Sequence, residues 1–122
     1  MKKTNTLIGL ALASALTCST LAAKEIKVGA VMPMSGPLAA YGQVTNLGIK
    51  LANKMQPKLK NGDTIKIVLT DNKGDKVETA TATTKLISSD KVVAILGALT
   101  STNTAQTIAI ADKKKIPVIA SV

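Results

Sequence analysis

Short apolar runs rich in β-branched residues recur along the chain, and stretches with a helical repeat separate them. Four such runs predict strands, over residues 26–32, 65–70, 92–96 and 117–120. The later runs are apolar almost without interruption, which is typical of strands buried on both faces of a parallel sheet.

Three helices are predicted between these strands. Pro37 suits the first turn of the first helix, and Asp75-Lys76-Val77-Glu78 has the pattern of a capping box at the start of the second. A segment rich in Ser and Thr precedes the third. The expected rows of side chains are Leu38, Tyr41, Val44, Gly48, Leu51 and Met55; then Val77, Ala80, Thr84 and Ile87; then Ala105, Ile108, Ala109 and Asp112.

Strict alternation of strand and helix predicts the α/β class, with a doubly wound parallel sheet and right-handed crossovers. If the first strand lies between the second and the third, ligands are expected beyond the carboxyl ends of the first and third strands. The fourth run is not followed by a helix that could cover its face. We therefore expect residues 24–122 to be an incomplete α/β lobe.

The first 23 residues have the pattern of a secretory signal peptide. Lys2 and Lys3 precede an uncharged apolar run over residues 7–16, and small residues follow it. The alternative, an uncleaved membrane anchor, is disfavoured because the run is shorter than the roughly 20 residues that span a bilayer. We expect cleavage before Lys24 or one residue earlier, and a periplasmic location.

Cys18, the only cysteine, lies within this leader. It could mark a lipoprotein acylation site, but such sites usually have Leu three residues earlier and Gly, Ala or Ser just before the cysteine. Here Ala15 and Thr17 occupy those positions. Lipid anchoring through Cys18 is therefore the less favoured interpretation.

The composition excludes several functions. The net charge is +9 at pH 7, but the lysines are scattered, Arg is absent and Tyr41 is the only aromatic residue, which disfavours nucleic-acid binding. The chain has no His, and no Cys after the leader, which excludes Ser-His or Cys-His catalysis and a Cys/His zinc site in this stretch. Nucleotide-binding glycine motifs are absent as well. We predict a protein that is not an enzyme and that has no metal or cofactor.

The loops after the first and third strands, residues 33–37 and 97–104, are the candidate site. Hydroxyls of Thr100, Ser101 and Thr102 lie beside the free N–H groups at the start of the third helix, where a carboxylate is the natural guest. The alternative is plain helix capping, since Ser and Thr are preferred N-cap residues.

Three other positions near these loops have simpler interpretations. Tyr41 is expected to be a core residue with its hydroxyl at the rim. Asp71 could steer ligands electrostatically, but a solvated turn residue is favoured. Residues 35–37 are expected to form an ordinary turn.

Taken together, these residues resemble periplasmic solute-binding proteins of the leucine/isoleucine/valine type, which deliver ligands to ABC transporters. The resemblance covers the chain after the leader and rests on Lys24-Glu25-Ile26-Lys27-Val28-Gly29-Ala30-Val31, Met34-Ser35-Gly36-Pro37, Ala40-Tyr41-Gly42, Ile95-Leu96-Gly97, residues 100–102 and Ile116-Pro117-Val118-Ile119. Members of that family are several times longer and have two α/β lobes of the type I fold that close over the ligand. The resemblance therefore implies that this chain is the first part of lobe 1.

The resemblance also implies roles for single residues. Ser101 matches a hydroxyl that binds the α-carboxylate of the ligand, and Tyr41, Leu99 and Thr100 match positions near the ligand side chain. Val122 matches a position whose backbone lines the pocket. The groups that hold the ligand's ammonium belong to the other lobe.

The resulting hypothesis is an extracytoplasmic receptor, monomeric at full length, that passes a small amino acid or amide to a membrane permease. Two alternatives remain open at this point. The same lobe could belong to a ligand-sensing ectodomain, or to an exported enzyme whose catalytic residues lie downstream.

Overall fold

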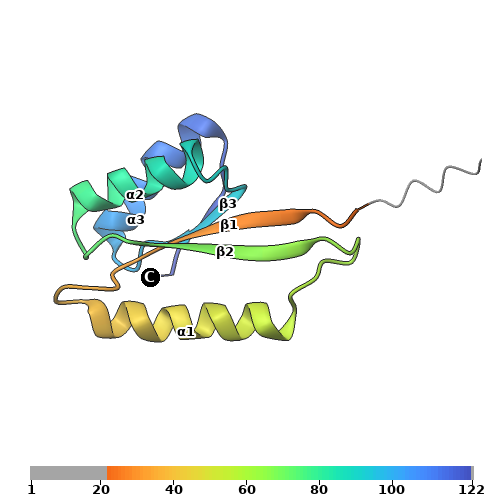
Figure 1. The fold of residues 1–122 in the computed structure, drawn as a ribbon. Helices are drawn as coiled ribbons and strands as arrows, with labels where there is room; N and C mark the ends of the chain where they lie inside the picture. Colours follow the sequence, from red (N-terminus) through yellow and green to blue (C-terminus); the bar gives the residue numbers. More distant parts are fainter. Residues whose placement is uncertain (1–21, 122) are drawn as a thin grey trace, which may run out of the picture.

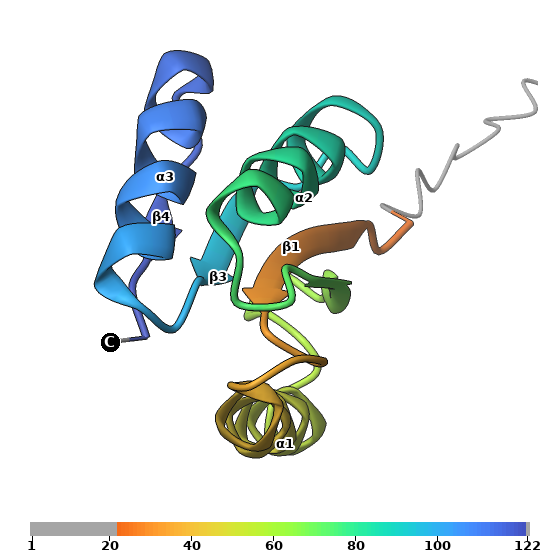
Figure 2. The same cartoon turned by 90° about the vertical axis from the view of Figure 1, so that its left-hand side faces the viewer.

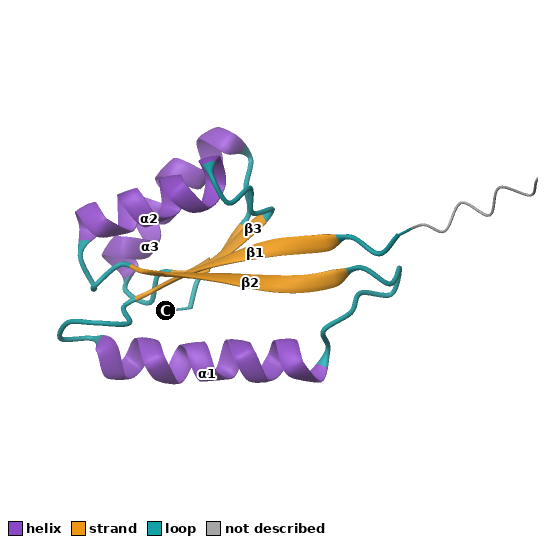
Figure 3. Ribbon diagram, viewed as in Figure 1, coloured by secondary structure: helices purple, strands orange, loops and turns teal. Residues whose placement is uncertain are grey.

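The computed structural model describes residues 22–121 (Figure 1). Strands and helices alternate as the sequence predicts (Figure 3). The elements are β1 (Glu25–Met32), α1 (Ala39–Met55), β2 (Thr64–Asp71), α2 (Lys76–Ser88), β3 (Ala94–Gly97), α3 (Ser101–Ala111), a 3₁₀ turn (Asp112–Lys114) and β4 (Val118–Ile119). The strand at the end of the chain is shorter than predicted.

The four strands form one parallel sheet in the order β2-β1-β3-β4, so β1 lies between β2 and β3, which is the condition under which ligands are expected at the ends of β1 and β3. Helix α1 covers one face of the sheet, and α2 and α3 lie side by side on the other (Figures 1 and 2). The fold is therefore α/β and doubly wound, as expected.

The apolar core lies between the sheet and the α2/α3 layer. Its buried members are Val31, Ala82, Leu86, Val92, Ile95, Ala98 and Ala111. On β1, alternate residues point to this core: Val31 belongs to it, and a Cβ added to Gly29 would meet Leu86. Val28 points the other way, toward α1, where it lines a groove with Ile49.

Most residues of the predicted rows on the three helices are exposed, although Ile87 on α2 is partly buried and packs against the core. Tyr41, Val44, Leu51 and Met55 on α1 are 59–78% exposed. Val77 on α2 is 73% exposed, and Ile108 on α3 is 46% exposed. The buried residues are instead Gly42 and Asn46 on α1; Thr79, Ala82, Thr83 and Leu86 on α2; and Asn103, Thr104, Thr107 and Ala111 on α3. Small and polar side chains thus form much of the inner surface of the helices.

Hydrogen bonds explain how α2 and α3 bury threonines. The Thr79 hydroxyl donates to the Asp75 carbonyl at 2.6 Å and accepts from the Asn72 side-chain amide at 3.0 Å. The hydroxyls of Thr83 and Thr107 lie 3.3 Å apart between the two helices. Because each hydroxyl has a partner, its burial carries little penalty, and the small side chains let the helices approach closely.

The start of α2 confirms one predicted cap. The Asp75 carboxylate accepts hydrogen bonds from the backbone N–H groups of Val77 and Glu78, at 2.7 and 2.9 Å. The Glu78 carboxylate pairs with the Lys73 ammonium at 3.0 Å, away from the Asp75 N–H, which donates to the Asn72 carbonyl. The capping box is therefore formed on one side only.

Over residues 22–121, no helix is long and apolar enough to cross a membrane.

Candidate functional site

The carboxyl ends of β1, β2 and β3 meet at one edge of the sheet, which faces the viewer in Figure 2. The loops that leave these ends lead into α1, α2 and α3. This is the edge where ligands bind in open α/β sheets. The two candidate loops, residues 33–37 and 97–104, both lie here.

The loop after β3 takes its path from residues with unusual backbone angles. Gly97 has φ +140°, and a Cβ at this position would clash with the Val31 carbonyl oxygen, so only glycine fits. Leu99 also has a positive φ, of 76°. The Ala98 N–H donates to the Thr104 hydroxyl at 2.9 Å, which ties the loop to the first turn of α3.

Thr100 is the N-cap of α3. Its hydroxyl accepts from the Asn103 N–H at 3.3 Å, and its carbonyl accepts from the Thr104 N–H at 2.8 Å. The capping interpretation is therefore confirmed for Thr100. Asn103 and Thr104 are buried, so these two residues of the segment make contacts within the lobe and do not face solvent.

Ser101 and Thr102 are the exposed part of the same turn. A first helical turn leaves N–H groups without intrahelical acceptors, and Thr100 supplies an acceptor only for Asn103. Two exposed residues with hydroxyl side chains therefore lie at the positive end of the α3 dipole. This arrangement can bind a carboxylate, and the assignment of Ser101 and Thr102 to a ligand stays a prediction.

Tyr41 lies at the start of α1, on the opposite face of the sheet from α3 (Figure 2). It is 66% exposed, so the expectation that it is a core residue is wrong. The reason is the neighbouring Gly42, which is buried so closely against Pro33 that a Cβ would clash with the Pro33 carbonyl. Because adjacent helical residues point about 100° apart, this contact turns the Tyr41 ring toward solvent.

Four of the predicted site residues lie together at the start of α3. Leu99 and Thr100 are half-buried next to the exposed Ser101 and Thr102, so the structure brings these four together in one turn. It does not join them to Tyr41, which reaches the same sheet edge from the far side. Val122 lies outside the described residues.

Asp71 is the residue at this edge whose role the sequence did not reveal. One carboxylate oxygen accepts from the backbone N–H groups of Met34 and Lys73, both at 2.8 Å, and from that of Ser35 at 3.4 Å. The other accepts from the Ser35 hydroxyl at 2.6 Å. Asp71 therefore makes the expected turn contact with the Lys73 N–H, and in addition it fastens the loop after β1 to the end of β2, a role that the sequence did not predict.

These contacts shift the ionisation of Asp71. Partial burial raises the pKa of its carboxyl, but the hydrogen bonds from the Ser35 hydroxyl and from the N–H groups of Lys73, Met34 and Ser35 outweigh it and hold the pKa below its ordinary value. The signal that could have found this role is position. Asp71 ends a strand beside the one that leads into residues 33–37.

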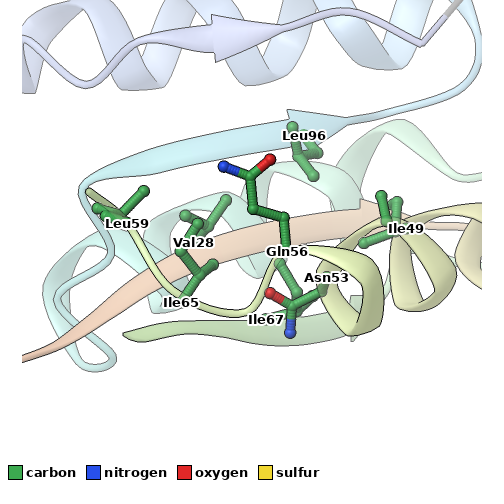
Figure 4. Close-up of a pocket in the computed structure, with 9 residues that line it drawn as sticks. Val28, Ile49, Asn53, Gln56, Leu59, Ile65, Ile67 and Leu96 are labelled. Atoms are coloured by element: carbon green, nitrogen blue, oxygen red, sulfur yellow. The ribbon is translucent and has the colours of Figure 1, made fainter. Parts of the chain in front are cut away.

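A groove of about 430 Å³ lies elsewhere, between α1 and the sheet (Figure 4). Its walls are mainly apolar, with Val28, Ile65, Ile67 and Leu96 from the strands and Ile49 from α1. The polar side chains of Asn53 and Gln56 also reach it. None of the predicted site residues lines this groove, so it is a feature separate from the carboxyl edge.

Residues 22–121 contain no group of three or more His, Cys, Asp or Glu side chains that could hold a metal ion. The carboxylates at the carboxyl edge already have partners: Asp71 accepts from the loop after β1, Asp75 caps α2, and Glu78 pairs with Lys73. The exposed hydroxyls and N–H groups at the start of α3 remain. Their chemistry suits the binding of an organic anion.

Comparison with solved structures finds similar chains among solute-binding proteins. Leucine-binding LivK from Thermotoga maritima is 30% identical with a TM-score of 0.75, over 78% of this chain and 27% of that one. LivJ from Streptococcus pneumoniae, solved with isoleucine, is 38% identical with a TM-score of 0.74, over 80% and 28%. A solute-binding protein from Rhodopseudomonas palustris, solved with 3,4-dihydroxybenzoic acid, is 29% identical with a TM-score of 0.74, over 79% and 26%.

This chain thus matches only about a quarter of the length of those proteins. No match was found among curated proteins. The model of the periplasmic binding protein family matches residues 25–122, which is nearly all of the chain after the predicted leader. The chain therefore belongs to the periplasmic binding protein family.

Proposed function

We propose that this chain supplies the carboxylate-binding side of the ligand cleft in an extracytoplasmic solute receptor of an ABC transporter. In this proposal residues 1–23 direct export, and residues 24–122 are the first part of lobe 1. The ligand carboxylate binds to the Ser101 hydroxyl and to the free N–H groups in the first turn of α3. Leu99, Thr100 and Tyr41 lie near the rest of the ligand.

The proposal rests on the different roles of the residues in the first turn of α3. Thr100 caps the helix and Thr104 holds the loop, whereas Ser101 and Thr102 are exposed at the carboxyl edge without a structural task of this kind. Anion binding at such a helix start follows from its free N–H groups and its dipole. Membership of the periplasmic binding protein family supports the same edge as the ligand-binding one.

The favoured ligand is an aliphatic amino acid, because two of the similar proteins are a leucine-binding protein and a LivJ with bound isoleucine. A second candidate is an aromatic carboxylic acid, since similar proteins from Rhodopseudomonas palustris were solved with 3,4-dihydroxybenzoic acid and with benzoate. Both ligands carry the carboxylate that the first turn of α3 suits. They differ in the body of the ligand, which residues outside this chain would also contact.

The test is a chimera in which residues 24–121 replace the matching part of LivJ from Streptococcus pneumoniae, which then provides the second lobe. Isothermal titration calorimetry with isoleucine, leucine and benzoate identifies the ligand class. Ser101→Ala in this chimera should weaken binding of the best ligand by about 1 to 3 kcal/mol, or roughly 5- to 150-fold, because a charge-assisted hydrogen bond is lost.

The matched control is Ser89→Ala, an exposed serine at the end of α2, which should leave affinity unchanged. Unchanged affinity in Ser101→Ala would contradict the assignment of Ser101. A chimera that folds but binds none of these carboxylates would contradict the proposed function.

A further inference from the structure

Asp71 joins two neighbouring loops at the carboxyl edge. Its carboxylate accepts hydrogen bonds from the N–H groups of Met34 and Ser35 and from the Ser35 hydroxyl, at 2.8, 3.4 and 2.6 Å. It also accepts from the Lys73 N–H at 2.8 Å. These partners belong to residues 33–37 and to the loop that follows Asp71, so the carboxylate fixes the path of the chain from β1 to α1.

The backbone continues this connection beyond Ser35. Gly36 has φ +79°, and a Cβ added there would lie 2.9 Å from the Lys73 carbonyl oxygen. The Gly36 carbonyl accepts from the Ala39 N–H at 3.1 Å, where α1 begins. The loop after β1 therefore lies directly against the loop after β2, and it enters α1 at a fixed point.

Tyr41 lies at the end of this path, in the first turn of α1. Its N–H donates to the Leu38 carbonyl at 3.1 Å. The next residue, Gly42, is so close to Pro33 that a Cβ would clash with the Pro33 carbonyl. The turn is thus held both at Pro33 and, through Asp71, at the residues that follow Pro33. Because a helical side chain has few rotamers, the place of the Tyr41 ring follows from the place of this turn.

The strand order separates Asp71 from the proposed carboxylate site. Strands β2 and β3 lie on opposite sides of β1, so their ends are about 10 Å apart. Among the described residues, no hydrogen bond links the Asp71 carboxylate with the start of α3. The influence of Asp71 on a ligand therefore acts through α1, which carries Tyr41, and not through Ser101.

We propose that Asp71 is a positioning residue for the body of the ligand. It holds the loop after β1 and the first turn of α1 in the place from which the Tyr41 ring contacts the ligand, while Ser101 binds the carboxylate independently. Asp71 itself does not touch the ligand, because the two loops occupy its carboxylate. The inference rests on the proposed function, in which Tyr41 lies near the rest of the ligand.

The test is a set of double substitutions in the LivJ chimera. Isothermal titration calorimetry uses whichever of isoleucine, leucine and benzoate binds the unsubstituted chimera most tightly. Asp71→Ala and Tyr41→Ala should each weaken binding about tenfold, and together also only about tenfold, because both remove the same contact. Asp71→Ala with Ser101→Ala should instead multiply the two separate losses, since the carboxylate site is independent.

The matched control is Asp63→Ala, which removes a carboxylate from the opposite end of the same strand. The Asp63 carboxylate accepts from the Lys24 N–H and from the Asn61 side-chain amide, both at 2.8 Å. At about 3.3 Å per residue it lies about 26 Å from Asp71. This substitution should lower the free energy of unfolding and leave ligand affinity unchanged.

A milder variant, Ser35→Ala, serves if the Asp71→Ala chimera does not fold. It removes only the 2.6 Å hydrogen bond between the Ser35 hydroxyl and the Asp71 carboxylate. We expect binding to weaken about threefold, and we expect this loss to disappear when Tyr41→Ala is already present.

Three results would overturn the proposal: unchanged affinity in Asp71→Ala, losses from Asp71→Ala and Tyr41→Ala that multiply, or an equal loss in Asp63→Ala. The last two would mean that Asp71 acts on the lobe as a whole. Each of these results leaves the proposed function standing as long as Ser101→Ala weakens binding. A chimera that binds none of the three carboxylates would instead contradict the proposed function, and this inference with it.

Discussion

The two faces of the sheet are built differently. On the α2/α3 face, Leu86 and Ile95 are fully buried, and the threonines between the helices are hydrogen-bonded. On the α1 face, the side-chain oxygens of Asn46 and Asn53 are buried without a hydrogen-bond donor. A groove of about 430 Å³ also lies between part of α1 and the strands. The difference indicates that the α2/α3 layer is packed more completely than the α1 layer, although Ala30 and Met32 of β1 are fully buried as well.

The largest expected effect on stability is at the α2/α3 face of the sheet. Leu86→Ala should lower the free energy of unfolding by about 2 to 5 kcal/mol, because Leu86 is fully buried and its truncation leaves a cavity in the core. Leu51→Ala, which changes a side chain on α1 that is 59% exposed, is the matched control and should change the free energy of unfolding by no more than about 0.5 kcal/mol. Urea denaturation of both variants measures the contrast. Similar losses of stability in the two variants would contradict the conclusion that the α2/α3 layer is packed more completely than the α1 layer.

A smaller effect is expected where α1 is fastened to the sheet edge. Asp71→Asn should lower the free energy of unfolding by about 1 to 2 kcal/mol near neutral pH, because the charged acceptor of the Ser35 hydroxyl and of three N–H groups is lost. The reference is Asp112→Asn, which changes an exposed carboxylate after α3 and should have little effect.

The same substitution makes a pH prediction. The folded-state pKa of Asp71 lies below the unfolded value of about 3.9, so its contribution is fully present well above pH 4 and is lost as the pH falls through the folded-state pKa. The stability difference between the native chain and Asp71→Asn should therefore shrink as the pH is lowered below about 4. Urea denaturation at pH 7 and pH 3 measures it. A constant difference would contradict the anchoring role of the carboxylate.

The smallest expected effect has the opposite sign. Asn53→Leu should raise the free energy of unfolding by about 1 kcal/mol, because it replaces a buried acceptor that lacks a donor with an apolar group beside an open apolar groove. Asn61→Leu is the control, since the Asn61 amide is exposed and bonded to Asp63 at 2.8 Å, and it should not stabilise. A destabilised Asn53→Leu chain would mean that the α1 face is better packed than this account holds.

The alternation of strands and helices and the helix start at Asp75 were predictable because they depend on local patterns. Apolar runs and a capping aspartate have the same meaning in most surroundings. The inward faces of the helices were not predictable in this way. Thr79, Thr83 and Thr107 are buried because each finds a hydroxyl or carbonyl partner, and such pairing between segments leaves no periodic signal in the sequence.

The site was predictable in part for the same reason. The hydroxyl-rich start of α3 follows from sequence, and the structure adds that Thr100 is the cap while Ser101 and Thr102 are exposed. Asp71 was not identified because its partners Met34 and Ser35 lie 37 and 36 residues away along the chain. Tyr41 was misplaced because the close contact of Gly42 with Pro33 decides the rotation of α1.

The most direct test of the central claim is a crystal structure of the LivJ chimera with its best-binding carboxylate. The account predicts a carboxylate oxygen within about 2.6 to 3.2 Å of the Ser101 hydroxyl and of an N–H group in the first turn of α3. A bound ligand whose carboxylate contacts other residues, with Ser101 and Thr102 facing only solvent, would contradict it.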